Sequence, residues 1–194
     1  MDFDNDSQLE IAIANGHVYR DAEPPSTYAQ RMQILFREST KRYAAFDLAD
    51  AAGYLAADHV GRAMWTVDAT RDGKQDLAVT HQTEPFALLM NETQTKHSWV
   101  KFELIGVDDS RDAVGAVVTV SDGSLNRISP VLSGNGFYCA SERSLHFGLG
   151  ADHKDGDPIR VTVTWPNMST TSYEVTANEQ WLLVQGDEQA FLSK

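Results

Sequence analysis

Residues 2–10 read DFDNDSQLE, and residues 68–76 repeat the pattern as DATRDGKQD. Both stretches can offer oxygen atoms from alternate positions of a tight turn, and a calcium ion prefers six to eight oxygen ligands. The two copies therefore predict calcium-binding loops and an internal repeat. The predicted ligands are Asp2, Asp4, Asp6, Gln8 and Glu10 in the first loop, and Asp68, Thr70, Asp72, Lys74 (through its backbone carbonyl) and Asp76 in the second.

The residues that follow each loop exclude an EF-hand and predict a β-strand. An EF-hand loop needs a bidentate Glu at its twelfth position, where this chain has Ile13 and Val79. Instead, apolar residues alternate with small or polar ones, with Ile11 before Ile13 and Leu77 before Val79. A period of two is typical of a strand. We therefore expect each loop to lie between strands.

The two loops differ in charge and in turn chemistry. The first has four acidic residues, whereas the second has three and carries two cations, Arg71 and Lys74. The second has Gly73 at the sixth position, where the first has Ser7, which must accept a turn conformation that glycine tolerates better. Charge favours metal binding by the first loop, and turn geometry favours the second. The alternative is an acidic, solvated loop without metal.

Composition excludes several classes of function. The chain has 194 residues, a net charge of −12 and a pI near 4.8. Its length allows one large or two small domains with a sizeable core. Its acidity argues against nucleic acid, whose affinity comes largely from neutralised phosphates, and against an anionic membrane surface. No apolar run reaches the length of a membrane span. Cys139 is the single cysteine, so no intrachain disulfide is possible, and we expect it buried in a strand.

The chain is expected to divide near residues 92–98. Before this break, short apolar strands are expected at 34–36 and 87–89, a loop at 21–27, and a short helix at 47–52 that ends at Gly53. After it, short strands at even spacing predict a sandwich or barrel, with a hairpin turn at Asp122-Gly123. These strands are expected at 99–105, 115–120, 127–132, 137–141, 144–149, 159–165, 171–175 and 181–184.

Four stretches of the second half read SRDAVGA at 110–116, SGNGFY at 133–138, LHFGLG at 145–150 and VTWP at 163–166. They resemble the ASPIC/UnbV domain family, which occurs in cartilage-acidic-protein-like and bacterial relatives. The family usually has a small residue and Gly after Trp-Pro, whereas Asn167-Met168 follow here.

In the first half, NGHVY at 15–19 follows the first loop, and RAMW at 62–65 precedes the second. With the two acidic loops, these stretches resemble FG-GAP (VCBS-type) repeats. This resemblance implies blades of a calcium-binding β-propeller. Ser7 and Thr70 depart from the family's loop pattern. A propeller closes with at least about four blades, so two units imply the C-terminal part of a longer protein, whose missing blades would be partners.

Together these patterns predict an all-β fold, with β-propeller-like blade repeats over residues 1–95 and a β-sandwich-like ASPIC/UnbV domain over residues 97–186. The resemblance implies an extracellular or periplasmic protein. The favoured function is a calcium-stabilised extracellular binding or adhesion module without catalysis, whose ligand is an unidentified protein or carbohydrate. One alternative is a carbohydrate-active enzyme or accessory domain with a site at the junction of the two parts. Another is a structural cap of a repeat array.

Other polar residues have ordinary structural interpretations. The carboxylates Glu103, Asp108 and Asp109 show no spacing that singles out a catalytic pair. His146 lies in an apolar stretch and is expected to be a core histidine, while His17 and His59 have no partner at a recognisable metal spacing. Arg111 and Asp112 are expected to stabilise a turn in preference to binding a sugar or carboxylate.

Overall fold

The computed structural model describes the whole chain except residues 20–27, 41, 47–52, 124, 155 and 194. The described residues form strands β1 to β14 and one short 3-10 helix, η1 (Gly53–Ala56), so the prediction of an all-β fold is confirmed. The helix expected at 47–52 and the loop expected at 21–27 lie outside the described residues. No helix within the described part of the chain is long and apolar enough to cross a membrane.

The first half contains two three-stranded antiparallel sheets. One has the order β1 (Ile11–Ile13), β2 (Gln33–Ser39), β3 (Arg42–Ala45). The other has the order β4 (Gly61–Val67), β5 (Asp76–His81), β6 (Ala87–Leu89). The strand after each loop, β1 or β5, pairs with the next apolar strand, so the sequence repeat is also a structural repeat. A propeller blade has four strands, and each of these sheets has three.

The second half is a sandwich of two four-stranded sheets. The first sheet has the order β10 (Leu145–Gly150), β7 (Ser98–Ile105), β13 (Glu179–Val184), β14 (Phe191–Leu192), and β13 runs parallel to β7. The second has the order β12 (Thr170–Val175), β11 (Ile159–Thr164), β8 (Val117–Ser121), β9 (Asn126–Pro130). Strand β14 lies beyond residue 186, the limit expected from the sequence.

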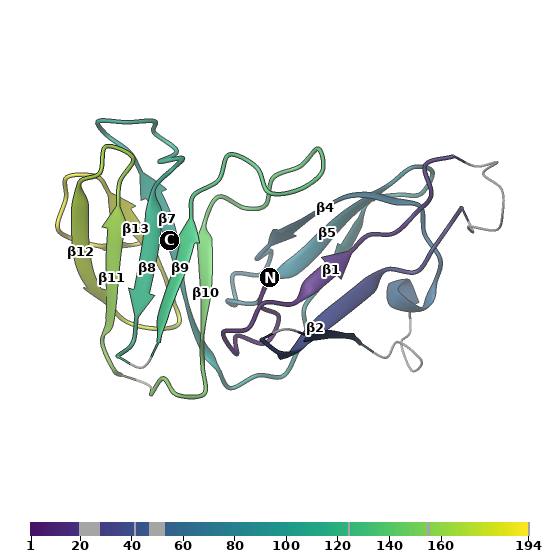
Figure 1. Cartoon of the computed structure of the whole chain (residues 1–194), viewed down its shortest axis with the longest axis horizontal. Helices are drawn as coiled ribbons and strands as arrows, with labels where there is room; N and C mark the ends of the chain where they lie inside the picture. Colours follow the sequence, from purple (N-terminus) through teal and green to yellow (C-terminus); the bar gives the residue numbers. More distant parts are fainter. Residues whose placement is uncertain (20–27, 41, 47–52, 124, 155, 194) are drawn as a thin grey trace.

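Alternating side chains of both sheets fill the core of the sandwich. Val118 and Val120 of β8, and Val161 and Val163 of β11, are fully buried. Burial of apolar surface of this kind is the main stabilising contribution to such a core. Strands β8 and β9 form the hairpin expected at Asp122-Gly123. Figure 1 shows the sandwich beside the two small sheets, with β10 on the side that faces them.

The strand predicted at 137–141 is wrong. Residues 132–144 contain no strand, and one isolated bridge joins Gly136 to Cys139. Tyr138 has a left-handed φ of 53°, which a strand residue does not adopt. The segment lies over β4 instead, because the Cys139 thiol donates a hydrogen bond to the Met64 carbonyl at 3.1 Å. Cys139 is therefore half-buried in a loop, not buried in a strand as expected.

Candidate metal centre

The two acidic loops have the same backbone geometry. In the first, the Ser7 amide donates to Asp2 Oδ2 at 3.0 Å, and in the second the Gly73 amide donates to Asp68 Oδ2 at 3.2 Å. Ser7 has a φ of 73° and Gly73 a φ of 79°. The turn conformation expected of Ser7 is therefore present, although it is unfavourable for a residue with a Cβ.

The last acid of each loop closes it in the same way. The Phe3 amide donates to Glu10 Oε2 at 2.9 Å, and the Ala69 amide donates to Asp76 Oδ2 at 2.9 Å. These bonds span seven residues in both loops and bring the two ends of each loop together. The loops are thus two copies of one oxygen-rich turn.

The first loop concentrates carboxylates around one point. Asp2, Asp4 and Asp6 each place an oxygen within 4.8 Å of the others. Asp2 is 3% exposed, and its Oδ1 is buried without a hydrogen-bond partner among the described residues. Burial raises the pKa of Asp2 to about 7, and the nearby negative charges of Glu10, Asp6 and Asp4 add to this effect. When ionised, a buried carboxylate with one unpartnered oxygen fits a hard cation.

The other two predicted ligands of this loop lie at its end. Glu10 is 6% exposed, and burial is the main cause of its raised pKa. Gln8 is exposed, and its side-chain Nε2 donates to Asp6 Oδ2 at 3.0 Å, so its side-chain and backbone carbonyl oxygens are both left for a cation. The loop therefore holds several oxygen donors and the cluster of Asp2, Asp4 and Asp6. Their fit to calcium rests on the unpartnered Asp2 oxygen.

The second loop is satisfied by the protein itself. Both oxygens of Asp76 accept backbone hydrogen bonds, from Asn91 at 2.7 Å and from Ala69 at 2.9 Å. Thr70 is exposed, and the Lys74 ammonium lies 3.7 Å from Asp72 Oδ2. Within the described residues, the acids of this loop do not form a cluster like that of the first loop. Its calcium site stays a prediction.

Lys101 of β7 supplies a cation beside the second loop. Its ammonium lies 3.5 Å from Asp68 Oδ2 and 2.8 Å from Glu142 Oε1, on a side chain that is 3% exposed. The Glu142 carboxylate also accepts the Asp68 amide at 3.1 Å. A cavity of about 10 Å³ remains beside these groups, which is about the room that one water molecule needs. The Lys101 ammonium thus already neutralises the Asp68 and Glu142 carboxylates.

The first loop is also the joint between the two halves. The Gly150 amide donates to the Asn5 carbonyl at 2.9 Å, and the Ser7 hydroxyl donates to the Gly148 carbonyl at 2.8 Å. A Cβ at Gly148 would lie 2.6 Å from Asn5 Cα and would overlap the Asp2 carboxylate. His146, expected to be a core histidine and not a ligand, is half-buried at this joint, where its Nε2 lies 2.7 Å from Asn5 Oδ1.

Arg127 of β9 strengthens the same joint. Its guanidinium donates to the Ser7 hydroxyl at 2.9 Å and to the Leu149 carbonyl at 2.6 Å, and it pairs with Asp122 at 2.9 Å. On the second loop, the Trp99 indole packs so closely on Gly73 that a Cβ there would overlap the ring. Both oxygen-rich loops therefore face the sandwich.

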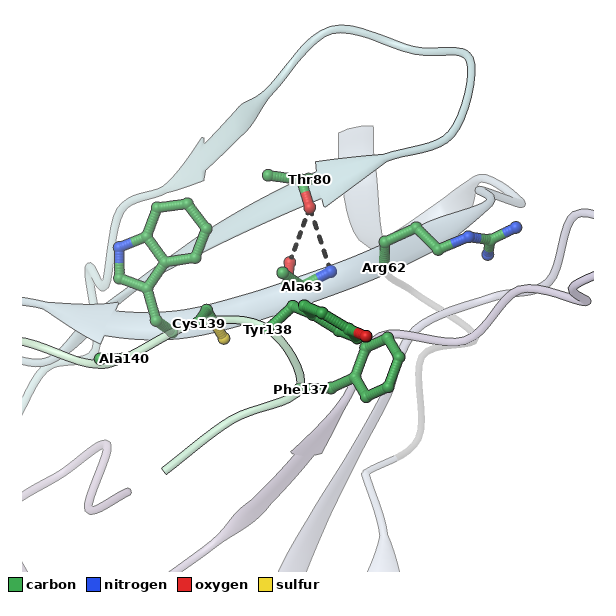
Figure 2. A pocket seen from close by; sticks show the side chains of 8 residues that line it. Arg62, Ala63, Thr80, Phe137, Tyr138, Cys139 and Ala140 are labelled. Carbon is green, nitrogen blue, oxygen red and sulfur yellow. Dashed lines mark hydrogen bonds between the residues drawn. The ribbon is translucent and has the colours of Figure 1, made fainter. Parts of the chain in front are cut away.

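A second, open depression lies where residues 137–140 cross β4. It has a volume of about 580 Å³ and is lined by Arg62, Ala63, Trp65, Thr80, Phe137, Tyr138, Cys139 and Ala140. Figure 2 shows the rings of Phe137 and Tyr138 beside the strand that carries Ala63. These rings are 70% and 92% exposed. Among the described residues, no carboxylate lines this depression.

Asp112 and His59 both meet partners that are distant in the sequence. Asp112 pairs with Arg143, on exposed side chains, so the acid of the expected Arg111-Asp112 turn has a partner from a distant loop. His59 lies 2.6 Å from Glu84 and forms a potential ligand group with it and His81. Residue spacing offered His59 no partner of this kind, and the structure brings Glu84 and His81 beside it. The signal is invisible in residue spacing because His59 and His81 are brought together by the pairing of β4 with β5.

Comparison with known proteins identifies the second half. Residues 106–190 match the family described as ASPIC and UnbV. The chain carries an ASPIC/UnbV domain. The expected resemblance to this family is confirmed, whereas the FG-GAP resemblance of the first half stays a prediction. In the ASPIC/UnbV domain, the stretch LHFGLG forms β10, and its two glycines are the residues on which the first loop docks.

The whole chain is also similar to named relatives. It is 29% identical to Cartilage acidic protein 1 of Xenopus tropicalis over 189 residues, 29% identical to that of Homo sapiens over 186, and 28% identical to that of Mus musculus over 186. Each match covers 92% of this chain but 26% of the relative. The chain thus spans about a quarter of the length of these proteins, and the similarity includes the part before the ASPIC/UnbV domain.

Proposed function

We propose that this chain is a calcium-stabilised, non-catalytic extracellular binding module, in which calcium in the first loop holds the repeat units against the ASPIC/UnbV domain. The observation that carries the proposal is the buried Asp2 Oδ1, which has no hydrogen-bond partner among the described residues and lies in a group of three carboxylates. A bound cation would satisfy this oxygen and offset the repulsion between the acids.

The donors proposed for calcium are all oxygens of the first loop. They are the carboxylates of Asp2, Asp4, Asp6 and Glu10, and the backbone carbonyl of Gln8. Calcium accepts mixed carboxylate and carbonyl ligands in flexible geometry. The ion would act structurally, because Asn5 and Ser7 of the same loop bond to β10. Ordering the loop would therefore order the contact between the two halves.

In the second loop, we assign the cationic role to Lys101. Its ammonium lies between Asp68 and Glu142 and supplies the positive charge that a metal ion would otherwise bring. The proposal therefore expects one calcium ion per chain, bound to the first loop.

The proposed binding face is the depression over β4. The exposed rings of Phe137 and Tyr138, together with Trp65 in the same lining, give aromatic surface at the junction of the two halves. Aromatic side chains of this kind are enriched in recognition surfaces. The ligand class is an extracellular protein or carbohydrate. The name of the relatives, which refers to cartilage, supports an extracellular setting.

The lining of this depression favours binding over catalysis. A glycoside hydrolase needs two carboxyl groups across the scissile bond, and the described lining has none. A cysteine nucleophile needs an adjacent base, whereas the Cys139 thiol donates to a backbone carbonyl. A carbohydrate-active enzyme at this junction is therefore the less favoured alternative.

Calorimetry on metal-stripped protein tests the proposal. Calcium should bind with a stoichiometry of one and raise the melting temperature, since a ligand at one hundred times its Kd stabilises by about 2.7 kcal/mol. Asp2→Asn should lose most of this shift, because it removes the buried unpartnered charge. The control, Asp152→Asn, makes the same change at an exposed position and should keep it. An unchanged shift in Asp2→Asn, or none in the wild type, would refute calcium binding by this loop.

A further inference from the structure

Two histidines and a glutamate meet at the far end of the second repeat unit. His59 lies just before β4, His81 is the last residue of β5, and Glu84 lies in the turn between β5 and β6. Gly61 pairs with His81 in the β4–β5 ladder, and this pairing places the two histidines on adjacent segments of the sheet. One potential ligand atom from each of the three lies within 4.8 Å of the other two.

Each imidazole has one nitrogen held by a backbone carbonyl. His59 Nε2 lies 3.0 Å from the Tyr54 carbonyl, and His81 Nδ1 lies 2.7 Å from the Pro85 carbonyl. A carbonyl can only accept, so these two nitrogens carry the protons. The opposite nitrogens, His59 Nδ1 and His81 Nε2, are left for other partners. Histidines that bind metals show this arrangement, in which the second ring N–H donates to a carbonyl or carboxylate.

The two opposite nitrogens contact oxygen atoms of neighbouring side chains. His59 Nδ1 lies 2.6 Å from Glu84 Oε2, and His81 Nε2 lies 2.7 Å from the Tyr54 hydroxyl. The Tyr54 ring stacks on the His59 ring at 3.9 Å with an angle of 8°, which fixes the imidazole plane. The side chains of His59 and Glu84 are 13% and 35% exposed, so the group is ordered by its neighbours yet reachable from solvent.

We propose that His59 Nδ1, His81 Nε2 and the Glu84 carboxylate bind a divalent transition-metal ion of the zinc type, with a water or the Tyr54 hydroxyl as fourth ligand. Two imidazoles and one carboxylate are an established zinc donor set, with metal–nitrogen distances of about 2.0–2.1 Å. Tetrahedral geometry then requires donors roughly 3.3 Å apart, which small side-chain rotations can reach from the present separation. Zinc would replace the proton of the His59–Glu84 hydrogen bond, so binding releases that proton.

This site is chemically distinct from the acidic loop. Imidazole nitrogen suits zinc, copper or nickel, whereas calcium takes oxygen ligands. The two sites lie on different parts of the repeat, and the inference does not depend on calcium binding. Metal binding would also affect the contact between the two repeat units. The Gln30 amide donates to the His59 carbonyl at 2.8 Å, and the His59 amide donates to the Gln30 carbonyl at 3.0 Å. A metal at His59 would therefore tie β5 and the β5–β6 turn to the seam between the two units.

Titration calorimetry with zinc chloride tests the site in calcium-saturated protein, above the usual imidazole pKa of about 6.5. Zinc should bind with a stoichiometry of one and release a proton, measured in two buffers of different ionisation enthalpy. His59→Gln, His81→Gln and Glu84→Gln should each weaken binding roughly 100-fold or more, since even outer-shell changes weaken metal sites by about 10–100-fold. His17→Gln, at a half-buried histidine outside this group, should bind like the wild type.

Two results would overturn the site. One is wild-type zinc affinity in the His59→Gln and His81→Gln double variant. The other is no stoichiometric zinc binding by the wild type, in which case His59 and Glu84 form an ion pair only. Circular dichroism and thermal unfolding show whether each variant is folded. If the double variant does not fold, NMR of the wild type decides, because zinc must shift the ring signals of His59 and His81 while leaving those of His17 in place.

Discussion

Lys101 and Asp68 form an ion pair at 3.5 Å with side chains that are only 3% and 4% exposed. Removing one partner of a buried pair leaves an uncompensated charge and typically destabilises by about 3–5 kcal/mol. Glu142, the other partner of Lys101, is 36% exposed and can be solvated in part. We therefore expect Lys101→Gln to lower the free energy of unfolding by about 3 kcal/mol in metal-free protein.

The same variant should gain a second calcium site. Without the ammonium, Asp68 and Glu142 have no internal cation, so calcium stoichiometry should rise from one to two and part of the lost stability should return with calcium. Denaturant unfolding with and without calcium measures both effects. Lys74→Gln is the control, because its pair with Asp72 is longer and more exposed, and it should change stability by less than about 1 kcal/mol. An unchanged stoichiometry in Lys101→Gln would contradict the cationic role of Lys101.

Gly148→Ala should separate the two halves without disturbing either core. The added Cβ would overlap the Asp2 carboxylate and lie 2.6 Å from Asn5 Cα, and overpacking of this kind typically destabilises by about 1–3 kcal/mol. We expect weaker calcium binding and faster amide hydrogen exchange in residues 2–10. Gly134→Ala, whose Cβ would meet only the Cys139 carbonyl at 3.7 Å, should behave like the wild type. Normal calcium affinity in Gly148→Ala would argue against coupling between loop and β10.

The raised pKa of Asp2 predicts that the stability of the metal-free protein depends on pH. Its pKa is raised to about 7 by burial, above the ordinary value of about 3.9, so the folded state binds more protons than the unfolded state between these values. This contribution to stability is fully present below about pH 4 and is lost as pH rises through about 7. Unfolding in EDTA at several pH values should show the loss. The plot of stability against pH should be flatter for Asp2→Asn than for the wild type. An equally steep plot would contradict the assignment of this pH dependence to Asp2.

The lowered pKa of His146 predicts the opposite trend, in which stability is lost as pH falls. Burial, aided by the positive charge of Lys101, lowers its pKa from 6.5 to about 4. Its contribution to stability is fully present above about pH 6.5 and is lost as pH falls towards 4. His146→Gln, which can still donate to Asn5 Oδ1, should be less sensitive to acid. NMR of the wild-type imidazole should show a neutral ring at about pH 5.5; a charged ring would disprove the prediction.

Tyr138 should contribute little to folding. Its left-handed φ of 53° is unfavourable for a residue with a Cβ, by about 1–2 kcal/mol, and its side chain is 92% exposed. Tyr138→Gly should therefore leave the free energy of unfolding unchanged within about 1 kcal/mol. Such a result would support a recognition role for the ring. A loss above about 2 kcal/mol would instead assign Tyr138 to stability.

Much of the local structure was predictable because its causes are local. Alternation of apolar residues identified β1, β5 and most sandwich strands, and Asp122-Gly123 identified the β8–β9 hairpin. The recurrence of acids at a fixed offset identified the two oxygen-rich loops. Segment 137–141 misled the prediction because apolar and aromatic residues favour a strand, although its conformation follows from a contact with β4.

The sequence by itself determined the all-β class, the repeated acidic turns and the ASPIC/UnbV motif, since each depends on residues close together in the chain. Only the tertiary structure decided which charges meet. Lys101 reaches Asp68 because β7 packs beside the second loop, and His59 reaches His81 through the β4–β5 ladder. Such meetings depend on strand pairing and packing between residues far apart in the chain, and residue spacing does not record them. For that reason the sequence left both loops as equal candidates, and packing distinguishes the loop with an internal cation from the loop with an unpartnered carboxylate.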